Sequence, residues 1–237
     1  MIVIKVGGNA ISQLNLAFLQ QIDAWLNARE TVILVHGAGP MFDEALAFAQ
    51  VPVTKIDGLR YTDEPTMTVM RDVLQQQVQP LIQHLFAQAH VAVNIVTNTV
   101  TAQVKAAGKY GLVGEVEHIH FTPKPGELMV VGPLLENAAG EWLNVNADEV
   151  ALAVAKHFQA DALYFVTDVA GVWDENKVIL DQLTPTLAAE LMQQKIVTAG
   201  MFVKLNAAFA ALQAGVKRIQ LGQTLTDGTK LILEETT

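Results

Sequence analysis

The sequence predicts a three-layer αβα sandwich with a mostly parallel central sheet, folded as a single domain of two lobes. Short apolar runs are continuous rather than alternating, and helical patterns separate them. Such runs are typical of parallel sheets that helices cover on both faces. The 237 residues contain no internal repeat and no long linker, which suits one large domain.

The elements are predicted from β-rich apolar runs and from the apolar periodicity between them. We expect strands at residues 2–6, 31–35, 91–96, 162–166 and 217–221. We expect helices at about residues 14–28, 41–50, 65–89, 149–158 and 201–214. Between about 101 and 135, three short runs (TAQVKA, LVGEVEHI and ELMVVG) are separated by Gly and Pro, which predicts hairpins or an edge sheet.

Composition excludes several classes of protein. The net charge is −9, whereas a nucleic-acid-binding protein needs a basic face. No stretch approaches the roughly 18–20 apolar residues of a membrane span, and the start resembles a first strand rather than a signal peptide. The absence of cysteine excludes disulfides, thiolate catalysis and cysteine-ligated zinc, and it suits a reducing compartment. We therefore expect a cytoplasmic protein that binds small molecules, not nucleic acid or a membrane.

Residues 35–40 read VHGAGP and join a predicted strand to a predicted helix. A dinucleotide-binding fingerprint needs a glycine where this sequence has Phe42, and a Walker A loop needs Gly-Lys-Ser/Thr where it has Gly-Pro-Met. Two interpretations remain. The segment is either a tight turn with Pro40 at the first helical position, or a cradle whose backbone N–H groups bind an anion.

The first strand ends in a second glycine turn, KVGG at 5–8. Glycine turns at the ends of adjacent parallel strands would form one crevice, which is where open α/β sheets bind ligands. Strand alternation turns Lys5 into a neighbouring layer, where a buried ammonium group is costly unless an anion meets it. The alternative is a surface lysine on an edge strand.

Two polar segments follow later strands. Asn144, Asn146 and Asp148 alternate along NVNAD, and either Asn146 or Asp148 would cap the next helix. Residues 167–172 read TDVAGV and predict a turn after a buried strand, with a ligand contact as the open alternative.

A lysine occupies an unusual place in the predicted helix that Gly200 opens. Lys204 lies one turn after Gly200, where the partial positive charge of the helix N-terminus disfavours a cation. A bound polyanion would make this position favourable. His118 and His120 share a strand face but lack a third ligand, so no metal site is predicted.

Taken together, seven segments resemble the amino acid kinase family in type and order, over nearly the whole chain. They are IKVGG at 4–8, VHGAGP at 35–40, DGLRYTD at 57–63, GEVE at 114–117, NVNAD at 144–148, TDVAGV at 167–172 and GMFVK at 200–204. The resemblance is greatest to the branch that phosphorylates the side-chain carboxylate of N-acetyl-L-glutamate in arginine biosynthesis. It implies a phosphotransferase with a carboxyl group as acceptor.

The resemblance implies an N-lobe (1–143) that binds the acyl amino acid and forms a homodimer, and a C-lobe (144–237) that binds ATP. Mg²⁺ would be carried by the nucleotide, without a metal site in the protein. The acceptor carboxylate is already ionised at neutral pH, so in-line transfer would need no general base. We expect a homodimer that does not respond to arginine.

The family pattern also implies a role for each matching position. The residues implied to act in catalysis are Lys5, Lys204 and Asp148. Those implied to bind phosphate are Gly7, Gly8, Gly37, Ala38 and Gly39. Those implied to bind the acyl substrate are Arg60, Asn144 and Asn146. Those implied to bind the nucleotide are Thr167, Asp168, Gly171, Gly200 and Met201.

Some positions depart from the family pattern. Ala38 replaces the middle glycine of the usual Gly-Gly-Gly turn, and its Cβ could crowd a backbone that must approach phosphate. The segment NIVTNTVTAQ replaces the usual Gly-Leu-Ser-Gly after the strand at 91–96. Two alternatives therefore remain: a kinase for carrier-protein-bound α-aminoadipate or another acyl acceptor, and a non-catalytic nucleotide or amino-acid sensor. The joint presence of Lys5, Asp148 and Lys204 favours an enzyme.

Overall fold

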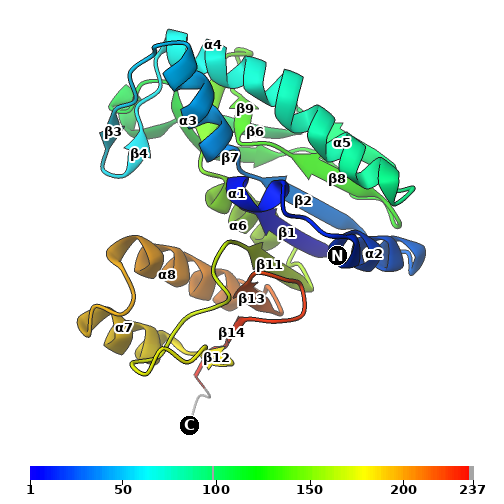
Figure 1. Ribbon diagram of the computed structural model, residues 1–237, viewed down its shortest axis with the longest axis vertical. Coiled ribbons are helices and arrows are strands. Elements are labelled where there is room, and N and C mark those ends of the chain that lie inside the picture. The colour runs from blue at the N-terminus through cyan, green and yellow to red at the C-terminus, as the bar shows by residue number, and fades with distance from the viewer. Residues whose placement is uncertain (98, 235–237) are drawn as a thin grey trace.

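The computed structural model describes residues 1–97 and 99–234, built around one eight-stranded sheet (Figure 1). The strand order is β12-β14-β13-β11-β1-β2-β8-β5. Six strands are parallel: β1 (Ile2–Val6), β2 (Val32–His36), β5 (Val93–Val96), β8 (Leu128–Val131), β11 (Ala162–Val166) and β13 (Ile219–Gly222). The edge strands β14 (Thr229–Leu231) and β12 (Gln182–Leu183) run in the opposite direction. The predicted mostly parallel sheet is confirmed.

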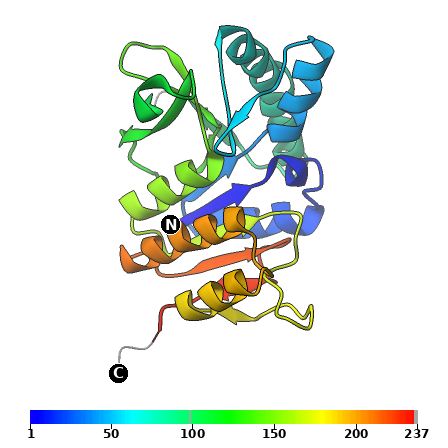
Figure 2. The same cartoon turned by 90° about the vertical axis from the view of Figure 1, so that its left-hand side faces the viewer.

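Helices cover both faces of this sheet. One core packs one face against α2 (Leu16–Asn27), α4 (Glu64–Val73) and α5 (Gln79–Gln88). A second core packs the other face against α6 (Ala147–His157), α7 (Pro185–Gln193) and α8 (Ala199–Gln213). In Figure 2 the second group lies in front of the sheet and α2 lies behind it. Both faces of the inner strands are therefore buried, which explains their continuous apolar runs.

The helix predicted at 65–89 is present as one long unit with an irregular centre. A π-helical turn, η1 (Leu74–Val78), joins α4 to α5. Several helices have polar side chains as N-caps, such as Asp63, which accepts a hydrogen bond from the N–H of Thr66 at the start of α4. None of the helices in the described part of the chain is both long enough and apolar enough to cross a membrane.

A small closed barrel stands beside the main sheet. Its strands are β6 (Val100–Val104), β7 (Val113–Ile119), β9 (Leu134–Glu136) and β10 (Trp142–Val145), with a 3₁₀ turn, η2 (Lys105–Gly108), between β6 and β7. A separate hairpin is formed by β3 (Lys55–Ile56) and β4 (Leu59–Arg60).

One prediction for this region was wrong. The run ELMVVG was assigned to a hairpin or edge sheet because it is short and flanked by Gly and Pro. It forms β8, a fully buried strand that pairs in parallel with both β2 and β5. The Gly and Pro residues that flank this run resemble those beside a hairpin strand. Its central position in the sheet depends on pairing with strands that are distant in the sequence.

Candidate active site

The two glycine turns meet in one crevice, as predicted from adjacent parallel strands. β1 and β2 pair in register, and at their carboxyl ends begin α1 (Gly8–Ile11) and α3 (Gly39–Phe48). A Cβ built on Gly8 would lie 2.7 Å from Cδ of Pro40 and 3.0 Å from the backbone nitrogen of Gly39. The absence of a side chain at Gly8 thus allows the two helix N-termini to touch.

The structure corrects the predicted phosphate role of two glycines. The N–H of Gly7 donates to the carbonyl of Val166 at 2.9 Å, and the N–H of Gly37 donates to the carbonyl of Val6 at 2.9 Å. Both N–H groups continue the sheet ladder and are occupied. Gly8 and Gly39 each open a helix, where an N–H has no acceptor within the helix and can meet an anion.

The crowding expected at Ala38 stays a prediction. Ala38 is the N-cap of α3 with φ −144°. Its side chain is buried and belongs to the core beneath the turn, and the residue also lines the crevice.

Lys5, Asp148 and Lys204 form a linked set of charges at one end of the crevice. Nζ of Lys5 lies 2.9 Å from Oδ1 of Asp148, and Nζ of Lys204 lies 3.0 Å from Oδ2. Lys5 alternates with Val3 along β1 and so turns toward α6, as predicted. Asn146 caps α6 by accepting a hydrogen bond from the N–H of Asp148 at 2.8 Å, which settles the predicted choice of cap in favour of Asn146.

These charges favour an anion. Burial raises the pKa of Asp148, but the ammonium groups of Lys5 and Lys204 outweigh that effect and hold the pKa below its usual value. An ionised carboxylate between two ammonium groups leaves one surplus positive charge. In a chain whose net charge is −9, this is a local site for a negatively charged ligand.

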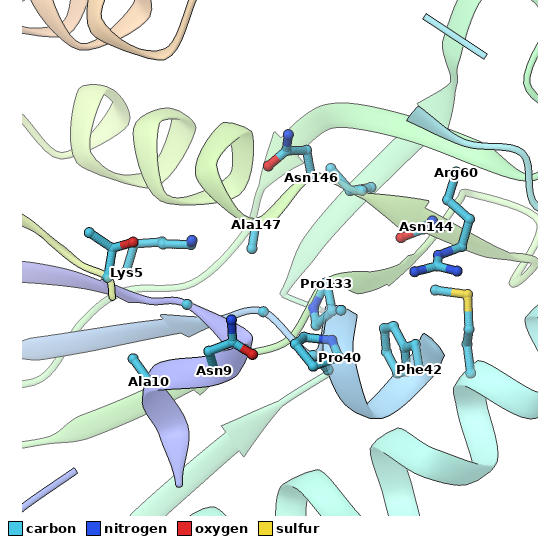
Figure 3. A pocket seen from close by; sticks show the side chains of 18 of the residues that line it. Lys5, Asn9, Ala10, Pro40, Phe42, Arg60, Pro133, Asn144, Asn146 and Ala147 are labelled. Carbon is cyan, nitrogen blue, oxygen red and sulfur yellow. The ribbon is translucent and has the colours of Figure 1, made fainter. Parts of the chain in front are cut away.

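The other end of the crevice is suited to a carboxylate on a carbon chain. The crevice holds about 350 Å³, and Figure 3 shows Arg60 and Asn144 at the end opposite Lys5. Nη1 of Arg60 is buried without a hydrogen-bond partner among the described residues. Nδ2 of Asn144 donates to Oγ1 of Thr62 at 3.1 Å. Three apolar side chains complete this end: Phe42, Leu59 and Met70.

The predicted nucleotide residues divide between two cavities. Thr167 and Asp168 line the crevice itself. The hydroxyl of Thr167 donates to Oδ1 of Asp168 at 3.0 Å and lowers the pKa of that carboxyl. Gly171 and Met201 instead line a second, mainly apolar cavity of about 150 Å³. Gly200 precedes Met201 in the first turn of α8 and lines neither cavity.

Sequence reasoning missed two residues of this site. Asn9, the second residue of α1, lines the crevice between Lys5 and Pro40 (Figure 3). Its position directly after the glycine pair was a usable signal. Asp43 of α3 accepts a hydrogen bond from Nη2 of Arg60 at 2.6 Å, and nothing in the sequence pattern indicated this pairing.

His118, near the end of β7, and His120, just after it, are neighbours in space. The ring centroids of His118 and His120 lie 5.4 Å apart. Within residues 1–97 and 99–234, no three His, Cys, Asp or Glu side chains are grouped as a metal ion would require.

Comparisons with known proteins agree with this architecture. The profile of the amino acid kinase family matches residues 1–222. An acetylglutamate kinase of Leuconostoc citreum is 34% identical over 234 residues, covering 95% of each chain. A crystal structure of a Streptococcus mutans UA159 protein matches with a TM-score of 0.87 and 33% identity over 97% of each chain. Carbamate kinase from Giardia lamblia shares the fold at a TM-score of 0.63 and 17% identity, over 98% of each chain. With a family match over nearly its whole length, the chain belongs to the amino acid kinase family.

Proposed function

We propose that this protein transfers the γ-phosphoryl group of ATP to the side-chain carboxylate of N-acetyl-L-glutamate. The observation that carries the proposal is the arrangement of one crevice: two lysines held by Asp148 at one end, and the unpartnered guanidinium edge of Arg60 at the other. The names of the relatives support the same reaction, since those at 32–34% identity are acetylglutamate kinases.

The acceptor end fits an N-acylated acidic amino acid. A guanidinium binds a carboxylate through parallel N–H groups, and Nη1 of Arg60 is buried with no other partner among the described residues. The amide of Asn144 is in reach of an acyl carbonyl, and Asn146, two residues further along the chain, lines the same crevice. The walls formed by Phe42 and Leu59 suit an acetyl methyl group.

Two lysines of the N-lobe are paired with carboxylates, which favours a small substrate over an acidic carrier protein. Lys109 is paired with Asp57 at 2.6 Å. Lys105 is paired with Glu149 at 2.8 Å. These lysines leave little net positive charge for a carrier surface.

Catalysis would rest on position and charge. Lys5 and Lys204 neutralise the phosphoryl oxygens, and Asp148 holds both ammonium groups in place. The N–H groups of Gly8 and Gly39, at the starts of α1 and α3, would bind the same anion. The attacking carboxylate is ionised at neutral pH, so no side chain has to remove a proton.

We assign the nucleotide to the C-lobe (144–237). The apolar cavity beside Gly171 and Met201 suits a flat base, and Thr167 and Asp168 lie between it and the phosphoryl site. Gly200 would let the phosphates approach the start of α8, since a Cβ there meets nothing within 4 Å. Asp168 is a single exposed carboxylate, which fits an Mg²⁺ ion that arrives on the phosphates and neutralises part of their charge.

The N-lobe (1–143) would supply the acceptor site and a homodimer interface. β5 is an edge of the main sheet, so one side of its backbone is free to meet a second copy. Size-exclusion chromatography with light scattering tests this: a mass twice that of the chain is expected, and a monomer would contradict it.

A hydroxamate-trapping assay tests the reaction. With ATP and Mg²⁺, turnover is expected with N-acetyl-L-glutamate and not with carbamate. Turnover only with α-aminoadipate derivatives would support the alternative acyl kinase. A folded protein that binds ATP but phosphorylates no N-acylated acid would support the sensor alternative.

A further inference from the structure

The contact between Arg60 and Asp43 joins the β3–β4 hairpin to α3, the helix that begins at Gly39. Nη2 of Arg60 donates to Oδ1 of Asp43 at 2.6 Å, while Nη1 of the same guanidinium has no partner in the described part of the chain. The Arg60 side chain is 11% exposed and that of Asp43 is 52% exposed. The two partners therefore differ in exposure. The guanidinium of Arg60 is largely buried, whereas the carboxylate of Asp43 that accepts its hydrogen bond lies in solvent.

Asp43 belongs to the helix that forms the phosphoryl cradle. α3 begins at Gly39, and Asp43 lies four residues later. Four residues of helix rise by about 6 Å, and this spacing does not change while the helix stays intact. The hydrogen bond to Asp43 therefore ties the position of Arg60 to that of the Gly39 N–H.

Arg60 itself comes from a short hairpin. It ends β4, which pairs with the two-residue strand β3, and the hairpin is tied to the barrel by the Thr62–Gly111 bridge and by the hydrogen bonds that Asp57 accepts. These contacts hold the backbone of the hairpin and not the guanidinium of Arg60. An arginine side chain has several rotatable bonds, and the hydrogen bond to Asp43 fixes the orientation of its fork.

We propose that Asp43 is a positioning residue that selects the chain length of the acceptor. This rests on the proposed function, in which Arg60 binds one carboxylate and the phosphoryl site receives the other. Asp43 fixes the position of Arg60 relative to Gly39. It thereby sets the distance between the place where one carboxylate of the acceptor binds Arg60 and the place where the other receives the phosphoryl group. A chain with the spacing of glutamate is matched, and chains one methylene shorter or longer are not.

Steady-state kinetics of Asp43→Ala test the proposal, with Glu44→Ala as the matched control. Glu44 is the next residue of α3, is exposed, and forms no ion pair among the described residues. In Asp43→Ala the KM for N-acetyl-L-glutamate should rise by about tenfold, because a charge-assisted hydrogen bond no longer orients Arg60. The KM for ATP and kcat should stay within about threefold, and Glu44→Ala should match the wild type.

Specificity and a double variant separate positioning from a structural role. The preference of Asp43→Ala for N-acetyl-L-glutamate over N-acetyl-L-aspartate and N-acetyl-α-aminoadipate should fall at least about threefold, and Asp43→Asn should restore part of it. The variant Arg60→Ala/Asp43→Ala should have the same KM as Arg60→Ala, since Asp43 acts only through Arg60.

The measurements distinguish a failure of this inference from a failure of the proposed function. If the wild type phosphorylates N-acetyl-L-glutamate while Asp43→Ala keeps its KM and its preference, the inference is overturned and the proposed function stands. If the effects of the two substitutions simply add, Asp43 does not act through Arg60. If the wild type phosphorylates no N-acylated acid, the proposed function fails and the inference fails with it.

Discussion

Gly8 and Pro40 lie so close together that no side chain fits between them. A Cβ on Gly8 would come within 2.7 Å of Cδ of Pro40, and the next nearest atoms are backbone atoms of the same turn. The proline ring and the backbone cannot rotate away as a long side chain can. This contact is the point at which the turn after β1 meets the turn after β2, and it brings two helix N-termini together.

We therefore expect Gly8→Ala to separate the two turns. The overpacking should cost about 1–3 kcal/mol in the free energy of unfolding. A displacement of about 1 Å between the two cradles should lower kcat/KM by about 100-fold. Gly39→Ala is the control for stability, because a Cβ there meets nothing within 4 Å. Thermal unfolding of both variants checks this, and equal melting temperatures would contradict it.

Local periodicity predicted the parts of the site that depend on one element. Lys5 points toward α6 because side chains alternate along a strand, and Lys204 lies near the start of α8, which begins at Ala199, one residue before the predicted Gly200. The seven ordered motifs identified the family for the same reason, since all but GEVE at 114–117, which lies inside β7, include or directly follow a strand end or a helix start.

Pairings between distant elements could not be predicted in this way. Arg60 meets Asp43 only because the β3–β4 hairpin folds against α3. The barrel closes through a parallel pairing of Asn144 with Val113, and neither residue carries a local signal for it. The hydrogen bond from the N–H of Gly7 to the carbonyl of Val166 likewise depends on β11 lying beside β1.

Lys204→Ala tests the role of the second ammonium group. The charge of Lys204 should matter most when negative charge develops on the transferring phosphoryl group, so kcat should fall by about 100-fold or more. The free carboxylate of Asp148 keeps its contact with Lys5 at 2.9 Å, so the fold should be retained. Lys156→Ala, at the exposed far end of α6, is the control. Near wild-type turnover in Lys204→Ala would remove this lysine from the mechanism.

The pH profile of kcat tests the absence of a general base. The pKa of Asp148 is held below its usual value, and a glutamate side chain titrates near pH 4.3, so both are fully ionised above about pH 6. We expect kcat to be constant between about pH 7 and 9 at saturating Mg-ATP and acceptor. A rate that rises with a single ionisation inside this window would show that a titrating base takes part.

His36 should make the folded state sensitive to mild acid. Its ring is fully buried at the end of β2, and burial lowers its pKa from 6.5 to about 4. At pH 5 the unfolded chain binds a proton on this ring and the folded chain does not, so stability is full above pH 6.5 and falls as the pH drops toward 4. The loss from pH 8 to pH 5 should be about 2 kcal/mol. Urea unfolding at a series of pH values measures this loss.

His36→Asn should be less stable at pH 8 but lack this part of the pH dependence. The control His84→Asn, at an exposed histidine, should keep it. Identical slopes in His36→Asn and the wild type would show that the His36 ring is not the group that titrates.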